Sequence, residues 1–227
     1  MRRLQKYISL PILITWLSIG SCLAQKVFMT GDSHVFSKIY PNKTEEILRS
    51  QHPDISFSWW AKNGICFHSF NTRPEYFDSI FSFRPDILIV HLGTNGAYGT
   101  RFSRPAFRKE METFYSSLTD TVPDIQVVFV TPFTNKKRRY KKKGKWRVNY
   151  KNREASDEII AFVKDHPNTY VIDNNKEVGM QFIKSKTLIR PDNVHLTEKG
   201  YSLLAEQVGT ELLSIEPLWH MRSEVAE

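Results

Sequence analysis

The sequence is poor in cysteine, with only Cys22 and Cys66 among 227 residues. This excludes the disulfide-dense frameworks that hold small secreted domains together. No group of cysteine, histidine and acidic residues has the spacing of a metal site, so we predict no metal and no other cofactor. Apolar residues make up 41% of the chain and charged residues 25%, as is usual for a globular protein with one well-buried core.

The sequence also lacks an apolar run of the roughly 20 residues that a membrane span requires. The longest uncharged apolar stretch, Tyr7 to Gly20, is shorter, follows a basic start and precedes small residues that end at Ala24. This order is typical of a secretory signal. We therefore predict a signal peptide over residues 1–24, a periplasmic or secreted protein, and no transmembrane helix in the mature chain.

Two processing sites fit this signal. Cys22-Leu23-Ala24 favours cleavage before Gln25, whereas Ile19-Gly20-Ser21-Cys22 resembles a lipobox that would leave Cys22 as a lipid-bearing N-terminus. We favour cleavage before Gln25, because a strand predicted to start at Lys26 leaves almost no tether after Cys22. Either event leaves Cys66 without a partner, so we expect no disulfide.

Acidic residues are absent from the segment Lys136 to Arg147, which contains nine basic residues. Together with the signal, this segment accounts for the formal net charge of +8, and the rest of the chain is mildly acidic. Such a local patch suits contact with an anionic polymer, and it equally suits a solvated loop. Export and the acidic remainder argue against a nucleic-acid partner.

Apolar patterns predict strands that alternate with helices. The strands are expected at Lys26–Thr30, Ile55–Trp60, Asp86–Leu92, Ile125–Thr131 and Thr169–Ile172. The helices are expected at His34–Gln51, Arg73–Phe83, Ser103–Thr121, Tyr150–Asp165 and Thr197–Leu213. This alternation predicts one domain over residues 25–227, a flavodoxin-like three-layer α/β/α sandwich with a five-stranded parallel sheet. The basic segment follows the fourth strand, and we expect it to be a loop at the carboxyl end of the sheet.

The tripeptide Gly31-Asp32-Ser33 lies where the first strand turns into a helix. A serine there faces the edge of the sheet where ligands bind, and its N–H belongs to the unpaired first turn of the helix. That N–H is able to stabilise an oxyanion. The same three residues also suit a turn with a helix cap, so the motif needs further evidence.

A base for this serine is offered by the loop before the last helix. Asp192 precedes His195 by three residues, a spacing that lets the carboxylate reach the imidazole Nδ1 and leaves Nε2 for a serine. Pro191 and Asn193 are turn formers, so a plain surface turn is the alternative.

Two further blocks follow predicted strands. Gly93-Thr94-Asn95 comes after the most apolar strand and offers an amide donor on a flexible backbone. Asn63-Gly64 comes after the second strand and by itself indicates only a turn.

Together and in this order, the four blocks resemble those of the SGNH (GDSL-like) hydrolase family. They are Gly31-Asp32-Ser33, Gly64, Gly93-Thr94-Asn95 and Asp192-Asn193-Val194-His195, and the resemblance extends from about Lys26 to Leu213. It implies that Ser33 is the nucleophile, His195 its base and Asp192 the carboxylate that orients the base. It also implies an oxyanion hole formed by the Ser33 N–H, the Gly64 N–H and the Asn95 side chain.

Two residues depart from the family pattern. His34 stands where leucine often follows the serine, and Gly96 stands where aspartate often follows the asparagine. We expect His34 to be a first-turn helix residue without a catalytic role, the alternative being a place in the substrate pocket. The missing aspartate leaves the orientation of Asn95 open.

The stretch from His91 to Gly99 is similar to the carbohydrate and peptidoglycan O-acetylesterase branch of the family. The resemblance therefore implies an exported serine esterase that acts on an acylated, and specifically an acetylated, glycan. The alternatives are a lysophospholipase- or thioesterase-like acyl hydrolase, and a non-catalytic glycan- or polyanion-binding module. Aromatic residues predicted near the cleft suit sugar stacking, although the two on a strand equally suit core packing; they are Trp59, Trp60, Tyr98 and Trp146.

Overall fold

The computed structural model describes residues 24–97, 102–134, 139–142, 145–148, 151–176, 185, 187–192 and 194–220. The predicted signal peptide lies outside these residues except for Ala24, as do Tyr98 and Asn193. The signal and the choice between its two cleavage sites therefore stay predictions. None of the described helices is long and apolar enough to cross a membrane.

Five parallel strands form the central sheet, in the order β2-β1-β3-β4-β7. This confirms the predicted five-stranded parallel sheet. The observed bounds of each strand lie within one residue of the predicted ones. The strands are β1 (Lys26–Gly31), β2 (Ser56–Ala61), β3 (Ile87–His91), β4 (Gln126–Val130) and β7 (Thr169–Ile172).

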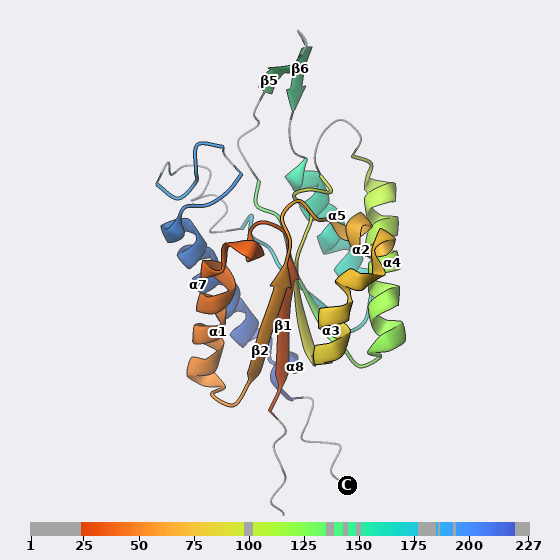
Figure 1. The fold of residues 1–227 in the computed structure, drawn as a ribbon, viewed down its shortest axis with the longest axis vertical. Helices are drawn as coiled ribbons and strands as arrows, with labels where there is room; N and C mark the ends of the chain where they lie inside the picture. The colour runs from red at the N-terminus through yellow and green to blue at the C-terminus, as the bar shows by residue number, and fades with distance from the viewer. Residues whose placement is uncertain are drawn as a thin grey trace, which may run out of the picture.

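Helices cover both faces of this sheet, which confirms the three-layer sandwich (Figure 1). One face carries α1 (Ile39–Gln51) and α7 (Glu198–Ser214), which pack against each other. The other face carries α2 (Phe67–Thr72), α3 (Asp78–Phe83), α4 (Arg104–Thr121) and α5 (Asn152–Asp165). A short helix, α8 (Pro217–His220), follows α7.

The hydrophobic core has two layers, one on each face of the sheet, because successive side chains along a strand point to opposite faces. In β3, Ile87 and Ile89 pack in the layer beneath α1 and α7, whereas Leu88 and Val90 pack in the layer beneath α2 to α5. Every residue of β3 is buried, and the strand is accordingly apolar from Ile87 to Val90, with the polar His91 at its end.

The helix predicted over His34–Gln51 is wrong at its start, because α1 begins at Ile39. Val35–Ser37 forms a 3-10 turn (η1), and Lys38 follows it with a φ of 64°. Pro41 explains the break: it has no N–H, and in a longer helix its ring would clash with the carbonyl four residues earlier. In the observed fold Pro41 occupies the first turn of α1, where backbone N–H groups have no partner within the helix.

Three other elements differ from the prediction. The helix α2 was not predicted, because six residues are too short to show a helical repeat. The helix predicted over Arg73–Phe83 is divided into a 3-10 turn (η2, Pro74–Tyr76) and α3. The basic segment is not a plain loop, since it forms an antiparallel pair of strands. Lysine has a low strand propensity, which conceals this pair in the sequence; the strands are β5 (Arg139–Lys142) and β6 (Lys145–Val148).

The packing of α7 against α1 depends on a small residue at Gly209. A Cβ added there would lie 2.8 Å from Cγ2 of Ile47 in α1. We expect Gly209→Ala to lower the free energy of unfolding by about 1 kcal/mol, because an overlap worth about 1–3 kcal/mol outweighs a helix-propensity gain of about 1 kcal/mol. Urea unfolding of both proteins measures the difference.

A second background isolates the cause. In a chain that already carries Ile47→Ala, the overlapping methyl groups are gone, and Gly209→Ala should become neutral or stabilising. An equal destabilisation in both backgrounds would show that contact with Ile47 is not the reason.

Candidate active site

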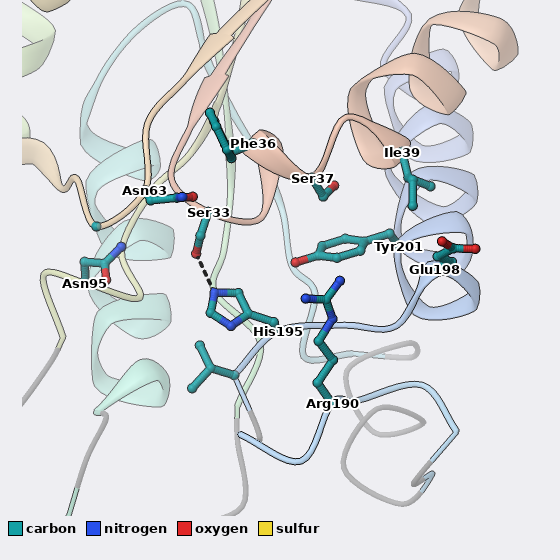
Figure 2. Close-up of a pocket in the computed structure, with 12 residues that line it drawn as sticks. Ser33, Phe36, Ser37, Ile39, Asn63, Asn95, Arg190, His195, Glu198 and Tyr201 are labelled. Atoms are coloured by element: carbon teal, nitrogen blue, oxygen red, sulfur yellow. Dashed lines mark hydrogen bonds between the residues drawn. The ribbon is translucent and has the colours of Figure 1, made fainter.

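The four sequence blocks meet at the carboxyl edge of the sheet. Ser33 lies in the turn after β1, Gly64 follows β2, Asn95 follows β3, and His195 precedes α7. All four line one cavity of about 680 Å³ (Figure 2). A volume of this size accommodates a small-molecule ligand.

Ser33, His195 and Asp192 form a continuous chain of hydrogen bonds. The Nε2 atom of His195 lies 3.0 Å from Ser33 Oγ, and its Nδ1 atom lies 2.8 Å from Asp192 Oδ2. A carboxylate on Nδ1 holds the tautomer in which Nε2 accepts a proton from a hydroxyl group. The geometry thus allows the imidazole to take the Ser33 proton and the carboxylate to stabilise the imidazolium.

The loop that carries His195 is held by its own backbone. The N–H groups of Val194 and His195 donate to Asp192 Oδ1, each at 2.9 Å, and fix the carboxylate in a tight turn. The N–H of Arg190 donates to the His195 carbonyl at 2.8 Å. Thr197 caps α7 by accepting from the Gly200 N–H at 3.2 Å.

Hydrogen bonding sets the charge state of Asp192. Partial burial acts to raise the pKa of this carboxyl, but bonds from the His195 ring and from the Val194 and His195 N–H groups outweigh it. The pKa is therefore held below its ordinary value. Asp192 is a carboxylate at neutral pH, as the orienting member of the chain must be.

Two backbone N–H groups on the cavity wall indicate an oxyanion site. Within the described residues, the N–H groups of Ser33 and Gly64 donate to no acceptor, and both residues line the cavity. Gly64 has a φ of 79°, a conformation that L side chains rarely adopt and that orients its N–H at the end of β2. Preorganised donors of this kind stabilise a tetrahedral oxyanion.

Asn95 is oriented by Asp32, which resolves the question left open by the missing aspartate at position 96. The Asn95 Nδ2 group donates to Asp32 Oδ2 and to the Ile65 carbonyl, each at 3.1 Å. Burial raises the pKa of Asp32 to about 7, against the opposing hydrogen bonds from His34 and Asn95. The Asn95 amide lines the cavity with both hydrogens engaged, and its part in the oxyanion hole stays a prediction.

His34 lies beneath the site and is not part of the cavity wall, so the alternative of a place in the substrate pocket is wrong. The ring is fully buried and stacks on His91 with the centroids 5.4 Å apart. Its centroid lies 5.9 Å from that of His195. Burial, helped by the neighbouring His91, lowers the pKa of His34 well below its ordinary value, so the ring is neutral.

Trp59 and Trp60 do not line the cavity. Trp59 packs against the core beneath α1 and α7, and Trp60 packs against Phe70 and Tyr76 on the other face. Their core-packing interpretation is the correct one. The cavity wall instead contains six residues that sequence reasoning missed, because only the fold brings them together: Phe36, Ser37, Ile39, Arg190, Glu198 and Tyr201.

Comparison with known proteins identifies a family whose members the chain resembles. The model of the GDSL-like lipase/acylhydrolase family matches residues 30–203. No curated protein sequence matches the chain.

Solved structures share the fold at low sequence identity. An acetyl xylan esterase, AlAXEase, is 19% identical over 82% of this chain and 99% of its own, with a TM-score of 0.65. A carbohydrate esterase family 3 protein from Talaromyces cellulolyticus is 16% identical over 84% and 97%, with a TM-score of 0.63. A peptidoglycan O-acetylesterase is 10% identical over 84% and 91%, with a TM-score of 0.71.

The buried His91 makes stability depend on pH. Burial lowers its pKa from 6.5 to about 3, so between these values the folded protein binds fewer protons than the unfolded chain. Stability is therefore lost as the pH falls below about 6, by about 1.4 kcal/mol per pH unit for this one group. We expect His91→Phe to reduce the slope of unfolding free energy against pH by about that amount between pH ~4 and ~6.

Urea unfolding of both proteins across this range measures the slopes. Asp32 has a raised pKa and acts in the opposite sense, but it is present in both proteins and drops out of the comparison. Equal slopes would show that His91 does not carry the effect.

Proposed function

Because the chain belongs to the GDSL-like lipase/acylhydrolase family and is a carboxylic ester hydrolase, we propose that it removes O-acetyl groups from carbohydrate or peptidoglycan by a Ser-His-Asp mechanism. The observation that carries the mechanism is the contact of 3.0 Å between His195 Nε2 and Ser33 Oγ, with Asp192 on the opposite ring nitrogen. This arrangement opens into a cavity large enough for a sugar ester.

The first half of the reaction forms an acetyl-enzyme. His195 Nε2 takes the proton from Ser33 Oγ as that oxygen attacks the acetyl carbonyl carbon, and Asp192 stabilises the imidazolium. The N–H groups of Ser33 and Gly64 donate to the oxyanion of the tetrahedral intermediate. His195 then returns its proton to the sugar oxygen, which leaves as a hydroxyl group.

The second half releases acetate. Water enters the vacated position, His195 takes its proton, and the resulting hydroxide attacks the carbonyl carbon of acetyl-Ser33. Collapse of the second intermediate breaks the ester, and His195 returns the proton to Ser33 Oγ. The enzyme is regenerated, and the net reaction consumes one water for each acetyl group removed.

Asn95 is the third donor in this proposal. An amide carries two hydrogens, and those of Asn95 are directed to Asp32 and to the Ile65 carbonyl. A developing oxyanion attracts an N–H more strongly than a neutral carbonyl does, because hydrogen bonds to charged groups are the stronger ones. One hydrogen therefore turns from Ile65 to the oxyanion while Asp32 keeps the other in place.

Acetylated glycans are the substrate class that the comparisons favour. Similar folds include an acetyl xylan esterase, a peptidoglycan O-acetylesterase and an esterase active on acetylated mannans. We also propose export to the periplasm or the exterior, on the strength of the signal pattern at residues 1–24. Contact of the basic segment Lys136–Arg147 with an anionic polymer stays a prediction from its charge alone.

An acyl hydrolase of longer chains is the second candidate. Phe36 is 47% exposed on the cavity wall, and Ile39 and Val194 lie on the same wall, so an apolar rim is available to an acyl chain. A family-model match and an intact hydrogen-bonded chain from Ser33 to Asp192 disfavour the non-catalytic binding module.

Removing the nucleophile or the base should abolish esterase activity. We expect Ser33→Ala and His195→Ala each to lower kcat on p-nitrophenyl acetate by about 10⁴-fold or more, because the members of such a chain act as a unit. Ser116→Ala, on the exposed surface of α4, is the matched control and should retain the rate of the unmodified protein. Near-normal rates in the Ser33 and His195 variants would refute the proposed mechanism.

The same assay over a series of acyl lengths separates the two candidate substrates. An acetylesterase should lose kcat/KM steeply from acetate to octanoate, whereas a lysophospholipase-like or thioesterase-like enzyme should gain. A maximum at long chains would overturn the acetyl preference and leave the mechanism intact.

Replacing the third donor should slow the chemical step. We expect Asn95→Ala to lower kcat on p-nitrophenyl acetate by about 10²- to 10³-fold with a smaller change in KM, because the donor acts on charge that exists only in the transition state. A thermal melt of the variant checks that the fold is retained. A kcat within a few-fold of the unmodified enzyme would exclude Asn95 from the oxyanion hole.

A further inference from the structure

Arg190 places a positive charge on the wall of the catalytic cavity. It lines the same cavity as Ser33 and His195, and Figure 2 shows its side chain directed from the loop toward Tyr201. Its backbone is bonded to the His195 carbonyl, and the neighbouring Ile189 pairs with Leu196 in an antiparallel bridge. The backbone of Arg190 is therefore tied to the loop that carries the catalytic base.

Among the described residues, no carboxylate forms an ion pair with this guanidinium. By contrast, Arg49, Arg104 and Arg108 each pair with at least one carboxylate. Glu198 also lines the cavity, but in Figure 2 its carboxylate lies beyond the Tyr201 ring from Arg190. A cation that faces a substrate cavity, with no ion-pair partner in the described part of the chain, is available to the substrate.

The charge of Arg190 acts inside the cavity. Burial raises the pKa of the Tyr201 phenol to about 12; a hydrogen bond with the Leu196 backbone and, after it, the positive charge of Arg190 oppose that rise. Tyr201 is therefore a neutral hydroxyl group at physiological pH, close enough to Arg190 to feel its charge. Tyr201 is almost fully buried, so the guanidinium of Arg190 is the group of this pair that the cavity wall presents to a bound molecule.

A planar guanidinium matches the two oxygens of a carboxylate, and such charge-assisted pairs are among the stronger hydrogen bonds in proteins. We infer that Arg190 is the carboxylate-binding residue of the substrate site, and that the enzyme acts on acetyl esters of acidic sugars. The carboxylate belongs to the sugar that carries the ester or to its neighbour, because Arg190 and Ser33 share one cavity. This inference rests on the proposed acetylesterase function.

A matched pair of substrates tests it. One is a mono-O-acetylated methyl glucuronoside, and the other is the same compound with its carboxyl group converted to a methyl ester. Acetate release by the full chain should show a kcat/KM about ten- to a hundredfold higher for the acid, as expected for a charge-assisted hydrogen bond. In Arg190→Gln this ratio should fall to about one, because KM for the acid rises while KM for the methyl ester stays the same. In Arg190→Glu the ratio should fall below one.

Lys199→Gln is the matched control. Lys199 is exposed in the first turn of α7 and is not part of the cavity wall, so its variant loses the same charge without touching the site. The preference for the acid should be unchanged in this variant. A fall equal to that of Arg190→Gln would mean that overall charge, and not a carboxylate site, sets the preference.

The remaining outcomes separate this inference from the proposed function. No acetate from either substrate would contradict the proposed function itself. Equal rates on both substrates, or a preference that survives Arg190→Gln, would overturn the role of Arg190 and leave the acetylesterase function standing. An Arg190-dependent preference for a lysophospholipid would assign the cation to a phosphate headgroup and overturn the acidic-sugar substrate.

Discussion

The hydrogen bond between Ser33 and His195 is the contact on which the rest of the site depends. It joins residues 162 positions apart, one in the turn after β1 and the other in the loop before α7. Two constraints make it possible. The parallel sheet brings the carboxyl end of β1 to the ligand-binding edge, and α7 packs beside α1 on the same face. Gly200 then lets the loop lie directly on the first turn of α7, because a Cβ there would overlap the Leu188 carbonyl oxygen.

The layer beneath this contact is unusually polar for a protein core. Within the described residues, the ring nitrogens of His34 and His91 have no hydrogen-bond partner, and neither do Thr30 Oγ1 and Tyr40 Oη. Buried polar atoms of this kind each cost about 1–3 kcal/mol. The buried Asp32 is close to them and holds Asn95 at the cavity. These unpartnered polar atoms lower the stability of the fold directly below the catalytic groups. Unsatisfied buried polar atoms are most often found near functional sites.

The sequence predicts the sheet and the catalytic chain well, because both depend on local patterns. The continuous apolar run of β3 requires burial on both faces, and the spacing of Asp192 and His195 lets one turn bring their side chains together. The break at Lys38 was missed because it follows from Pro41, a residue inside the apparent repeat. Arg190 and Phe36 have no local signal at all. Their importance arises only when η1 and the His195 loop, distant in sequence, form one cavity wall.

The central claim is that Ser33 carries the acyl group during turnover, and direct detection of the intermediate tests it. The enzyme would be mixed with an acetyl ester, quenched in acid within the first turnovers, digested and examined by mass spectrometry. The account predicts one added acetyl group on Ser33, present early, lost when substrate is exhausted, and absent in Ser33→Ala. An acetyl group on another residue during productive turnover, such as His34 or His195, would contradict it.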